Sequence, residues 1–233
     1  MANSYIVLLP CAGNGSRVKS KVPKQYIKIN GKTILEYTLD AFLATPQINQ
    51  IVIITAPDDD YIDAILTNYQ LTKIEVMKVG GSSRAISVKN GLNKLNCTEN
   101  DWVMVHDAAR CCILPQTIRR MIEILNSDEV GGILAIPAID TVKQGDGQVI
   151  SKTLDRRMIY LAQTPQMFRY KVLKTAYNEV NVSEATDDAA LVEKTGLEVK
   201  LVLGEPTNIK ITYKEDFDLA TMILSKQYVT PQK

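Results

Sequence analysis

Apolar residues follow two patterns along this chain, one typical of buried strands and the other of amphipathic helices. Residues 5–9 (YIVLL) form a continuous apolar run, as expected for a strand that is covered on both faces. Residues 34–43 (ILEYTLDAFL) instead repeat their apolar side chains at helical spacing. The two patterns go on alternating, and we expect further strands at 51–56, 74–79, 102–106 and 133–136 and helices at 61–69, 85–95 and 118–125. This alternation predicts an α/β fold in which helices cover both faces of a mainly parallel sheet.

The alternation stops at residues 140–155, which read DTVKQGDGQVISKTLD. Two short β-type runs flank Gly145-Asp146-Gly147, a turn signal of the hairpin kind. The segment is polar, and an isolated hairpin is at best marginally stable in water. We therefore expect a protruding β-arm at about residues 138–158, which leans either on a second copy of the chain or on its own domain.

After the arm, the pattern predicts the last elements of a single domain that spans residues 1–233. We expect strands at 159–163, 199–203 and 209–212, a helix from Lys171, a helix opened by Thr186-Asp187-Asp188 and ended near Gly196, and a closing helix at 215–224. The sequence shows no internal repeat, low-complexity tract or linker, which favours one domain over two.

Charge and composition restrict the partners and the location of the protein. The 27 basic and 26 acidic residues leave a net charge of +1, so bulk charge does not favour binding to nucleic acid or to a membrane surface. No apolar stretch approaches the roughly 20 residues that a membrane span needs, and the N-terminus lacks the basic region of a signal peptide. We expect a cytoplasmic protein whose four cysteines are free thiols rather than disulfide or zinc partners.

Residues 8–26 (LLPCAGNGSRVKSKVPKQY) join a glycine turn to a run of positive charge. The third glycine of a dinucleotide fingerprint is absent, and so is the pattern of a Walker loop. The backbone N–H groups around Gly13 and Gly15 could still wrap an anion, with Arg17 and Lys24 within reach of it. An arginine fork with a lysine point charge suits a phosphate whose charge grows in a transition state. A tight strand–helix turn with solvated charges is the alternative, and spacing alone leaves both open.

The motif VHDAAR at residues 105–110 ends an apolar strand in a carboxylate, Asp107. Ligands of open α/β sheets lie at the carboxyl ends of the strands, and Gly13 leaves room there if the two strands are neighbours. A carboxylate beside phosphates is a usual arrangement for Mg²⁺. The alternative for Asp107 is a helix N-cap. We expect His106 to be structural, because a catalytic base would need a serine and an orienting acid nearby.

Two further segments contain candidate binding residues. Residues 80–87 (GGSSRAIS) follow a strand, and glycine allows a base or ribose to approach the backbone closely at Gly81. Ser87 falls in the first turns of the next helix, although a loop with an N-cap serine explains the segment equally well. Lys210 lies in an apolar run, where an unpaired ammonium group would be costly.

Together the motifs occur in a specific order: A-G-x-G-x-R, P-K-Q-Y, G-G-x-x-R-x-x-S-V, V-H-D-A-A-R, D-R, T-P-Q, T-D and N-I-K-[IV]-T. In this order the chain, from about Ile6 to about Leu224, resembles the 2-C-methyl-D-erythritol 4-phosphate cytidylyltransferase family of the non-mevalonate isoprenoid pathway. The resemblance implies a Rossmann-like nucleotidyltransferase fold, Mg²⁺ as cofactor and a homodimer clasped by β-arms. It also implies transfer of CMP from CTP to the polyol phosphate, with release of pyrophosphate.

The resemblance implies a role for each matching position. Arg17 and Lys24 match the basic pair that stabilises the α-phosphate, and Asp107 matches the Mg²⁺ ligand. The positions that match the family's nucleotide-binding residues are Ala12, Gly13, Gly81, Ser87, Asp107 and Ala108. Those that match residues around the polyol phosphate are Arg156, Lys210, Thr186, Thr164, Thr141 and Arg110. Of these, Thr141 and Arg156 of the arm are expected to reach the site of the partner subunit.

Two other functions stay open at this stage. Ribitol 5-phosphate cytidylyltransferase shares the nucleotide machinery, but its family tends to have serine–valine in the middle of the D-A-A-R motif. A nucleotide-binding regulator on the same fold would not need Arg17, Lys24, Asp107 and Lys210 together. Two positions depart from the family pattern: Ser82, where relatives often carry an acidic residue, and Cys111, where proline usually follows D-A-A-R.

Overall fold

The centre of the fold is a seven-stranded sheet, as seen in a computed structural model that describes residues 3–13 and 22–229. In chain order its strands are β1 (Tyr5–Pro10), β4 (Gln50–Ile54), β5 (Ile74–Met77), β6 (Trp102–Val105), β7 (Gly131–Pro137), β10 (Tyr160–Arg169) and β11 (Lys200–Leu203). Across the sheet they lie in the order β11-β7-β10-β6-β1-β4-β5. Strand β10 is antiparallel to both β6 and β7, and the other neighbouring pairs are parallel. The predicted mainly parallel sheet is thus confirmed, with one reversed strand inside it.

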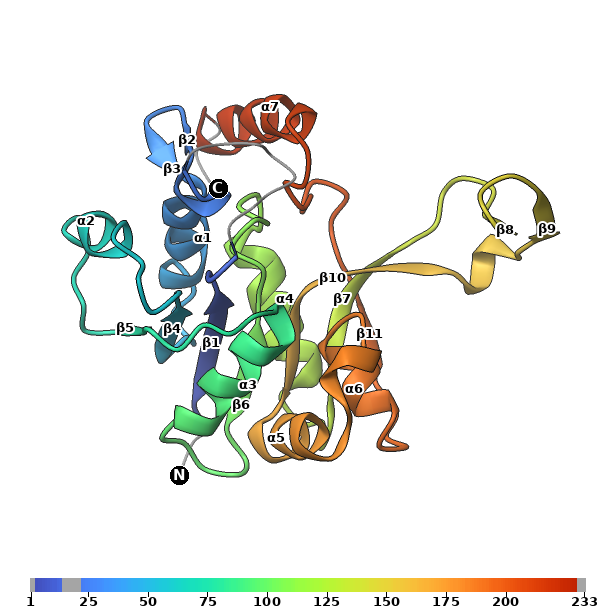
Figure 1. The fold of residues 1–233 in the computed structure, drawn as a ribbon, viewed down its shortest axis with the longest axis horizontal. Coiled ribbons are helices and arrows are strands. Elements are labelled where there is room, and N and C mark those ends of the chain that lie inside the picture. Colours follow the sequence, from blue (N-terminus) through green and yellow to red (C-terminus); the bar gives the residue numbers. More distant parts are fainter. Residues whose placement is uncertain (1–2, 14–21, 230–233) are drawn as a thin grey trace.

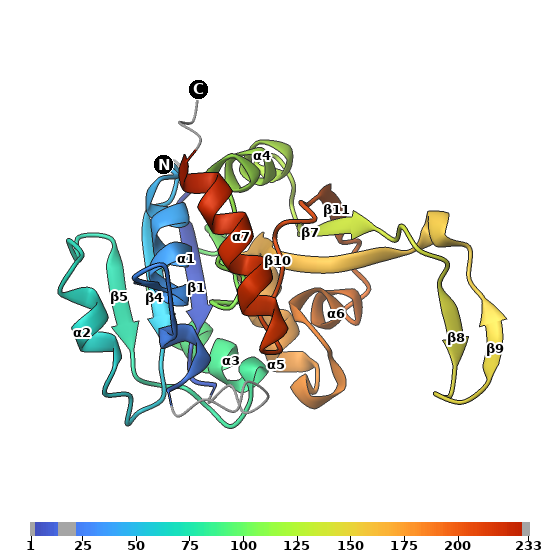
Figure 2. The ribbon, with the colours of Figure 1, turned by 90° about the horizontal axis from the view of Figure 1, so that it is seen from above.

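Helices cover both faces of this sheet, as the continuous apolar runs predict. The helices are α1 (Ile34–Leu43), α2 (Ile62–Leu66), α3 (Arg84–Lys94), α4 (Pro115–Leu125), α5 (Tyr170–Glu179), α6 (Asp188–Glu193) and α7 (Glu215–Val229). Along β1, Val7 and Leu9 pack with α1, α2 and α4, whereas Ile6 and Leu8 pack with α3, α5 and α6 on the opposite face (Figure 2). Because successive side chains of a strand point to opposite faces, burial on both sides requires an unbroken apolar run.

Side chains at the ends of the helices determine where several of them begin. Helix α1 opens with a capping box, in which Thr33 Oγ1 accepts from the Glu36 backbone N–H and Glu36 Oε2 accepts from the Thr33 N–H. Helix α4 has Pro115 in its first turn, and Asp187 caps α6 by accepting from the Ala190 N–H. These local signals explain why the predicted elements form where they do.

The predicted strand at 209–212 is wrong. The segment belongs to no strand, and its Ile211 N–H donates to the Ala109 carbonyl at 2.9 Å. Ile211 is buried against α1 and α7 in a third apolar cluster, whereas Lys210 is exposed. A loop that buries alternate side chains has the same sequence pattern as a strand, which explains the error. The predicted helix at 61–69 is also shorter, since α2 covers only Ile62–Leu66.

The sequence pattern did not predict five short elements. They are the strands β2 (Lys28–Ile29) and β3 (Lys32–Thr33) and the 3₁₀ helices η2 (Lys24–Tyr26), η3 (Arg156–Met158) and η4 (Val182–Glu184). The four cysteines carry free thiols, as predicted. Among the helices of residues 3–13 and 22–229, we find none with the length and apolarity of a membrane span.

The arm is confirmed as a hairpin that projects from the body of the protein (Figure 1). Strands β8 (Lys143–Gly145) and β9 (Ile150–Thr153) form its tip, and β7 and β10 lead to and from it. The carboxylate of Asp146 accepts from the N–H groups of Gln148 and Val149, which stabilises the turn. Every residue of β8 and β9 is exposed, and so are the large apolar side chains of Ile139, Val149 and Met158.

Candidate active site

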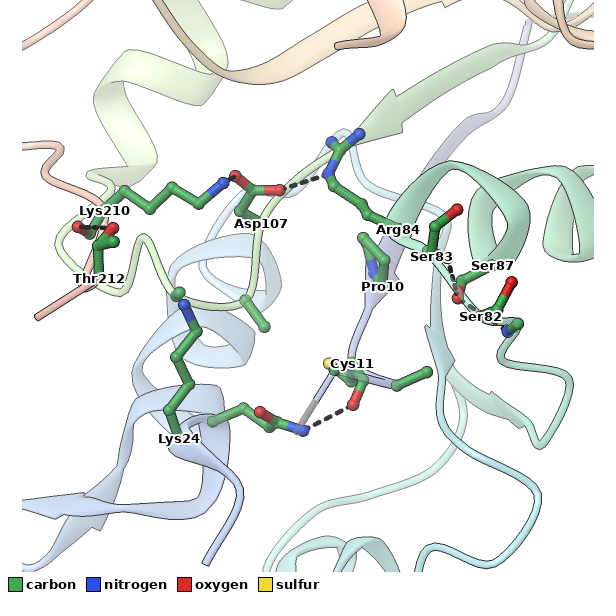
Figure 3. Close-up of a pocket in the computed structure, with 16 residues that line it drawn as sticks. Pro10, Cys11, Lys24, Ser82, Ser83, Arg84, Ser87, Asp107, Lys210 and Thr212 are labelled. Atoms are coloured by element: carbon green, nitrogen blue, oxygen red, sulfur yellow. Dashed lines mark hydrogen bonds and ion pairs between the residues drawn. The ribbon is translucent and has the colours of Figure 1, made fainter. Parts of the chain in front are cut away.

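A cavity of about 590 Å³ opens at the carboxyl ends of β1 and β6, which are neighbouring parallel strands. In such sheets, ligands bind where the loops after adjacent strands separate. Figure 3 shows the side chains that converge on this cavity. The structure places eight residues that the sequence selected in its lining: Ala12, Gly13, Lys24, Gly81, Ser87, Asp107, Ala108 and Lys210.

Small residues form one wall of the cavity. A Cβ atom at Gly80 would lie 2.2 Å from the Cβ of Ala12 and 2.7 Å from the Thr55 carbonyl oxygen, so only glycine fits between these two loops. At Gly13, by contrast, a Cβ would meet no atom of residues 3–13 and 22–229 within 4 Å. Gly13 lines the cavity, at a position where the sequence predicted room for a ligand.

Ser87 links the second glycine loop to α3. Its hydroxyl accepts from the Gly81 N–H at 3.0 Å and donates to the Ser83 carbonyl at 2.9 Å. Ser83 is the N-cap of the helix, since its Oγ accepts from the Ile86 N–H. The predicted N-capped loop is confirmed, and the same loop forms a wall of the cavity.

Asp107 lies at the centre of the cavity, between two cations. Arg84 Nε is 2.7 Å from Asp107 Oδ1, and Lys210 Nζ is 2.7 Å from Asp107 Oδ2. Figure 3 shows these two side chains reaching the carboxylate from opposite sides. Burial alone would raise the pKa of Asp107, but the charges of Arg84 and Lys210 outweigh burial and hold the pKa well below its usual range. The carboxylate is therefore ionised throughout the physiological pH range.

The alternative role of Asp107 as a helix N-cap is wrong. The residue occupies a turn in which the Arg110 N–H donates to the Asp107 carbonyl, and α4 begins only at Pro115 with Leu114 as its N-cap. The cost of a buried ammonium at position 210 is also avoided, because Lys210 is about 38% exposed and paired with Asp107.

His106 lies beneath the cavity and is fully buried. The Asp107 N–H donates to Thr164 Oγ1, which is 3.0 Å from His106 Nδ1, while His106 Nε2 is 3.3 Å from the Arg110 carbonyl. These partners fit a neutral ring that carries its proton on Nε2. Burial lowers the pKa of His106 to about 3, so the ring stays neutral at physiological pH. The prediction that this histidine is structural is confirmed.

Lys24 enters the cavity from the side opposite Arg84. It begins the 3₁₀ helix η2, and its ammonium donates to the Ile211 carbonyl at 2.8 Å. The neighbouring Gln25 amide donates to the Cys11 carbonyl at 2.6 Å, which fixes η2 against the end of β1. Arg17, the predicted partner of Lys24, lies outside the described residues.

The remaining predicted residues lie outside the cavity lining. Thr164 lies under the cavity floor, in contact with Asp107, and the guanidinium of Arg110 donates to the Asn208 carbonyl at 2.7 Å. Thr186 lines a neighbouring cavity of about 420 Å³, which shares Arg84 with the first. Thr141 and Arg156 belong to the arm, which projects from the body of the protein (Figure 1), and neither residue lines the cavity of its own chain.

Sequence reasoning gave no role to Arg84 or Asp188, although both belong to the cluster around Asp107. A signal for Arg84 was present: it is a cation in the first turn of a helix, where the helix dipole disfavours positive charge. Such a residue is best explained by carboxylate partners, but only the fold shows which ones they are.

The donor set at Asp107 fits Mg²⁺ that arrives with a polyphosphate. Mg²⁺ is often held by one or two carboxylates together with substrate phosphates and water. Asp107 supplies one such carboxylate in the cavity lining. The residues present therefore fit a Mg²⁺ ion that takes its remaining ligands from substrate phosphates and water.

Comparisons with known proteins show the family to which the chain belongs. The family model of 2-C-methyl-D-erythritol 4-phosphate cytidylyltransferase (IspD) matches residues 5–226. The chain is 43% identical over 222 residues to the protein of that name from Chromobacterium violaceum, covering 94% of this chain and 97% of the relative. It is 42% identical over 233 residues to a namesake from Burkholderia cenocepacia, covering 97% and 98%.

Solved structures give the same result. The chain resembles a crystal structure of 4-diphosphocytidyl-2C-methyl-D-erythritol synthase with a TM-score of 0.84 at 36% identity, covering 96% of this chain and 99% of the other. It also resembles the 2-C-methyl-D-erythritol 4-phosphate cytidylyltransferase of Francisella tularensis with a TM-score of 0.80 at 37% identity, covering 95% and 100%. The predicted nucleotidyltransferase fold is confirmed by these likenesses.

Proposed function

The chain belongs to the family of 2-C-methyl-D-erythritol 4-phosphate cytidylyltransferases, and from this premise we propose how its cavity carries out the reaction. The enzyme transfers CMP from CTP to 2-C-methyl-D-erythritol 4-phosphate, in the formation of isoprenoid precursors. The products are 4-diphosphocytidyl-2-C-methyl-D-erythritol and pyrophosphate. The observation that carries the proposal is the convergence of Lys24, Lys210 and Asp107 at the carboxyl ends of β1 and β6.

The reaction needs positioning and charge more than acid–base catalysis. An oxygen of the polyol phosphate attacks the α-phosphorus of CTP in line, a new P–O bond forms, and the bond to pyrophosphate breaks. The attacking phosphate is already an anion, so it needs no strong general base. This suits a cavity whose nearest histidine, His106, is neutral and buried beneath the floor. The protein's contribution is to align the reactants and stabilise the charge that develops.

Each part of the lining has a proposed task. Lys24, together with Arg17, stabilises the negative charge that grows on the α-phosphate. Gly13 and Gly81 let the nucleotide approach the backbone closely, and the place of both glycines in the cavity lining supports this role. Lys210 binds the phosphate of the acceptor, for which its half-exposed ammonium is well placed.

We assign Asp107 as the protein ligand of Mg²⁺. When bound, the ion would neutralise charge on the triphosphate and help pyrophosphate to leave. Asp107 is ionised, and the hydrogen-bond partner of its Oδ2 is Lys210, whose side chain is about 38% exposed, while Arg110 Nε lies farther from Oδ2, at 4.0 Å. That lysine can release the carboxylate for the cation and turn to the acceptor phosphate.

Release of pyrophosphate tests the function directly. We expect CTP and 2-C-methyl-D-erythritol 4-phosphate to give pyrophosphate together, with little release when the acceptor is left out. Ribitol 5-phosphate at the same concentration is the matched control. Faster turnover with ribitol 5-phosphate would show that the chain is a ribitol 5-phosphate cytidylyltransferase. Tight CTP binding without turnover of either acceptor would indicate a nucleotide-binding regulator.

We propose that the chain is a homodimer in which Thr141 and Arg156 of the arm complete the partner's site. Large apolar side chains exposed on the arm, such as those of Ile139 and Met158, support an interface there. The position of Arg156 on the arm, away from its own cavity, supports action in the other subunit.

Mixing two variants with strongly reduced activity tests whether the arm acts in the site of the partner subunit. We expect Arg156→Ala to lose roughly 10- to 100-fold in kcat/KM, as expected for one charged contact to a substrate phosphate. Arg157→Ala is the matched control, since Arg157 is also exposed and, in the described part of the chain, its guanidinium pairs with Asp155. Mixed dimers of Arg156→Ala and Lys24→Ala chains contain one complete site each, so random mixing should restore about a quarter of wild-type activity. No recovery in a mixture shown to exchange subunits would contradict action in trans.

A further inference from the structure

Arg84 bridges two buried carboxylates that lie far apart in the sequence. Its Nε donates to Asp107 Oδ1 at 2.7 Å, and its Nη1 and Nη2 atoms donate to the two oxygens of Asp188 at 3.2 and 2.8 Å. The contact to Asp188 is a two-pronged fork, whereas the contact to Asp107 is a single bond. Such a fork restricts the orientation of the guanidinium more than a single bond does.

Asp188 is itself held firmly. It is fully buried in the first turn of α6, and the hydroxyl of Tyr177 donates to its Oδ1. The start of α6 is tied to β10, because Gln166 Oε1 accepts from the Ala189 N–H at 2.9 Å. These contacts make Asp188 a fixed anchor on which Arg84 is oriented.

The two oxygens of Asp107 therefore differ. Oδ1 faces a guanidinium that is locked by Asp188. Oδ2 is paired at 2.7 Å with Lys210, whose side chain is about 38% exposed, and the Nε atom of Arg110 lies 4.0 Å from the same oxygen, beyond hydrogen-bond distance. We propose that Asp188 is a positioning residue: by holding Arg84 on Oδ1 alone, it keeps Oδ2 of Asp107 available for the divalent cation that arrives with CTP. This inference rests on the proposed role of Asp107 as the metal ligand.

The physical reason lies in competition for one carboxylate. A guanidinium released from Asp188 can form its own two-pronged pair with Asp107 and occupy both oxygens. It also adds an uncompensated positive charge within a few ångströms of the cation site, because the negative charge of Asp188 is gone. Both effects weaken binding of the metal, and neither weakens binding of the free nucleotide anion.

Binding of Mn²⁺ in place of Mg²⁺ tests the proposal without turnover. Free Mn²⁺ is followed by electron paramagnetic resonance, with CTP present, the enzyme in excess over CTP, and no acceptor. For Asp188→Asn we expect the Kd of Mn²⁺ to rise about tenfold or more, as is common when a partner of a metal ligand is removed. Affinity for CTP without metal should stay within about twofold of wild type or become tighter.

Turnover should change in the same direction. The Mg²⁺ concentration for half-maximal rate should rise in parallel with the Kd of Mn²⁺, with a smaller loss of kcat at saturating Mg²⁺. Asp128→Asn is the matched control: Asp128 is also a largely buried carboxylate that pairs with a cation, Lys200, but it lies away from the cavity. This variant should bind Mn²⁺ as the wild type does.

A second variant covers the case in which Asp188→Asn does not fold. Arg84→Lys keeps the charge but removes the fork, so it should weaken Mn²⁺ binding in the same way. Wild-type affinity in a folded Asp188→Asn or Arg84→Lys enzyme would overturn the proposal, and failure of both to fold would assign the pair to stability alone. If the Kd of Mn²⁺ is instead unchanged by Asp107→Asn, the proposed metal ligand itself is wrong.

Discussion

The cavity and the arm each present an arginine to the reaction we propose, but the surroundings of the two side chains are opposite. Arg84 lies between Asp107 and Asp188, whose side chains are about 9% and 0% exposed. Arg156 lies on a 3₁₀ turn of the arm with its side chain in solvent, and its guanidinium donates to the Ile139 backbone carbonyl. One arginine is oriented by buried partners of its own chain, and the other is not.

This difference indicates that one chain orients the side chains of its cavity by itself, whereas the side chains of the arm need an interface to be oriented. A buried ion-pair network specifies one geometry, because a misplaced charge in a poorly solvated site is costly. Exposed side chains keep several rotamers and gain little from their pairs in water. We therefore expect the cavity around Asp107 to be preformed in each chain and the arm to take its working geometry against a second copy.

Removal of a large side chain from the body should give the largest effect on stability. Phe168 on β10 is fully buried beside β6 and β7, so Phe168→Ala should lower the free energy of unfolding by about 3–5 kcal/mol. Urea denaturation followed by circular dichroism measures this. A decrease in the free energy of unfolding of less than 1 kcal/mol would mean that the interior around Phe168 is loosely packed. That result would contradict the contrast between a tightly packed body and an exposed arm.

Loss of one cation from the cavity should have the next largest effect. Lys24→Ala should lower kcat by about 10²- to 10³-fold, because one charge that stabilises the transition state is removed. Release of pyrophosphate at saturating CTP and acceptor measures the change. Lys28→Ala is the control, since Lys28 is nearby in the sequence but exposed on β2, and it should keep the wild-type rate. Near-normal turnover of Lys24→Ala would contradict the proposed role.

The buried histidine makes the stability of the cavity region depend on pH. The folded pKa of His106 is about 3 and its ordinary value 6.5, so between these values the unfolded chain binds more protons. Unfolding free energy should therefore rise with pH across this window by about 1.4 kcal/mol per pH unit from this group and level off above it. In His106→Asn this contribution should disappear, as measured by urea denaturation at several pH values. Equal slopes for variant and wild type would show that the ring is charged when buried.

The smallest effect is expected on the arm. Met158 is about 78% exposed, so Met158→Ala should change the unfolding free energy of the isolated chain by less than about 0.5 kcal/mol. The same substitution should weaken self-association, as measured by sedimentation at increasing protein concentration. A loss of more than 1 kcal/mol in dilute solution would show that the arm packs on its own chain.

Much of the fold follows from local sequence patterns. The apolar runs predict all seven strands of the large sheet, although β10 is longer than the predicted strand at 159–163, and Gly145-Asp146-Gly147 marks the turn of the arm. The pattern fails where two structures share one periodicity: residues 209–212 alternate like a strand, but they cross the end of the sheet as a loop. Nor does periodicity give direction, so the reversal of β10 between β6 and β7 was not predictable from it.

By itself, the sequence determined the helices and strands, the glycine turns, and the presence of Lys24, Asp107 and Lys210 at the ends of elements, because these depend on residues close together in the chain. Only the tertiary structure decided which charges meet. Arg84 and Asp188 are separated by 104 positions, yet they form the fork that orients the arginine on Asp107. A pair so distant is brought together only when the sheet and its covering helices are packed, and burial then makes that one arrangement much more favourable than the alternatives.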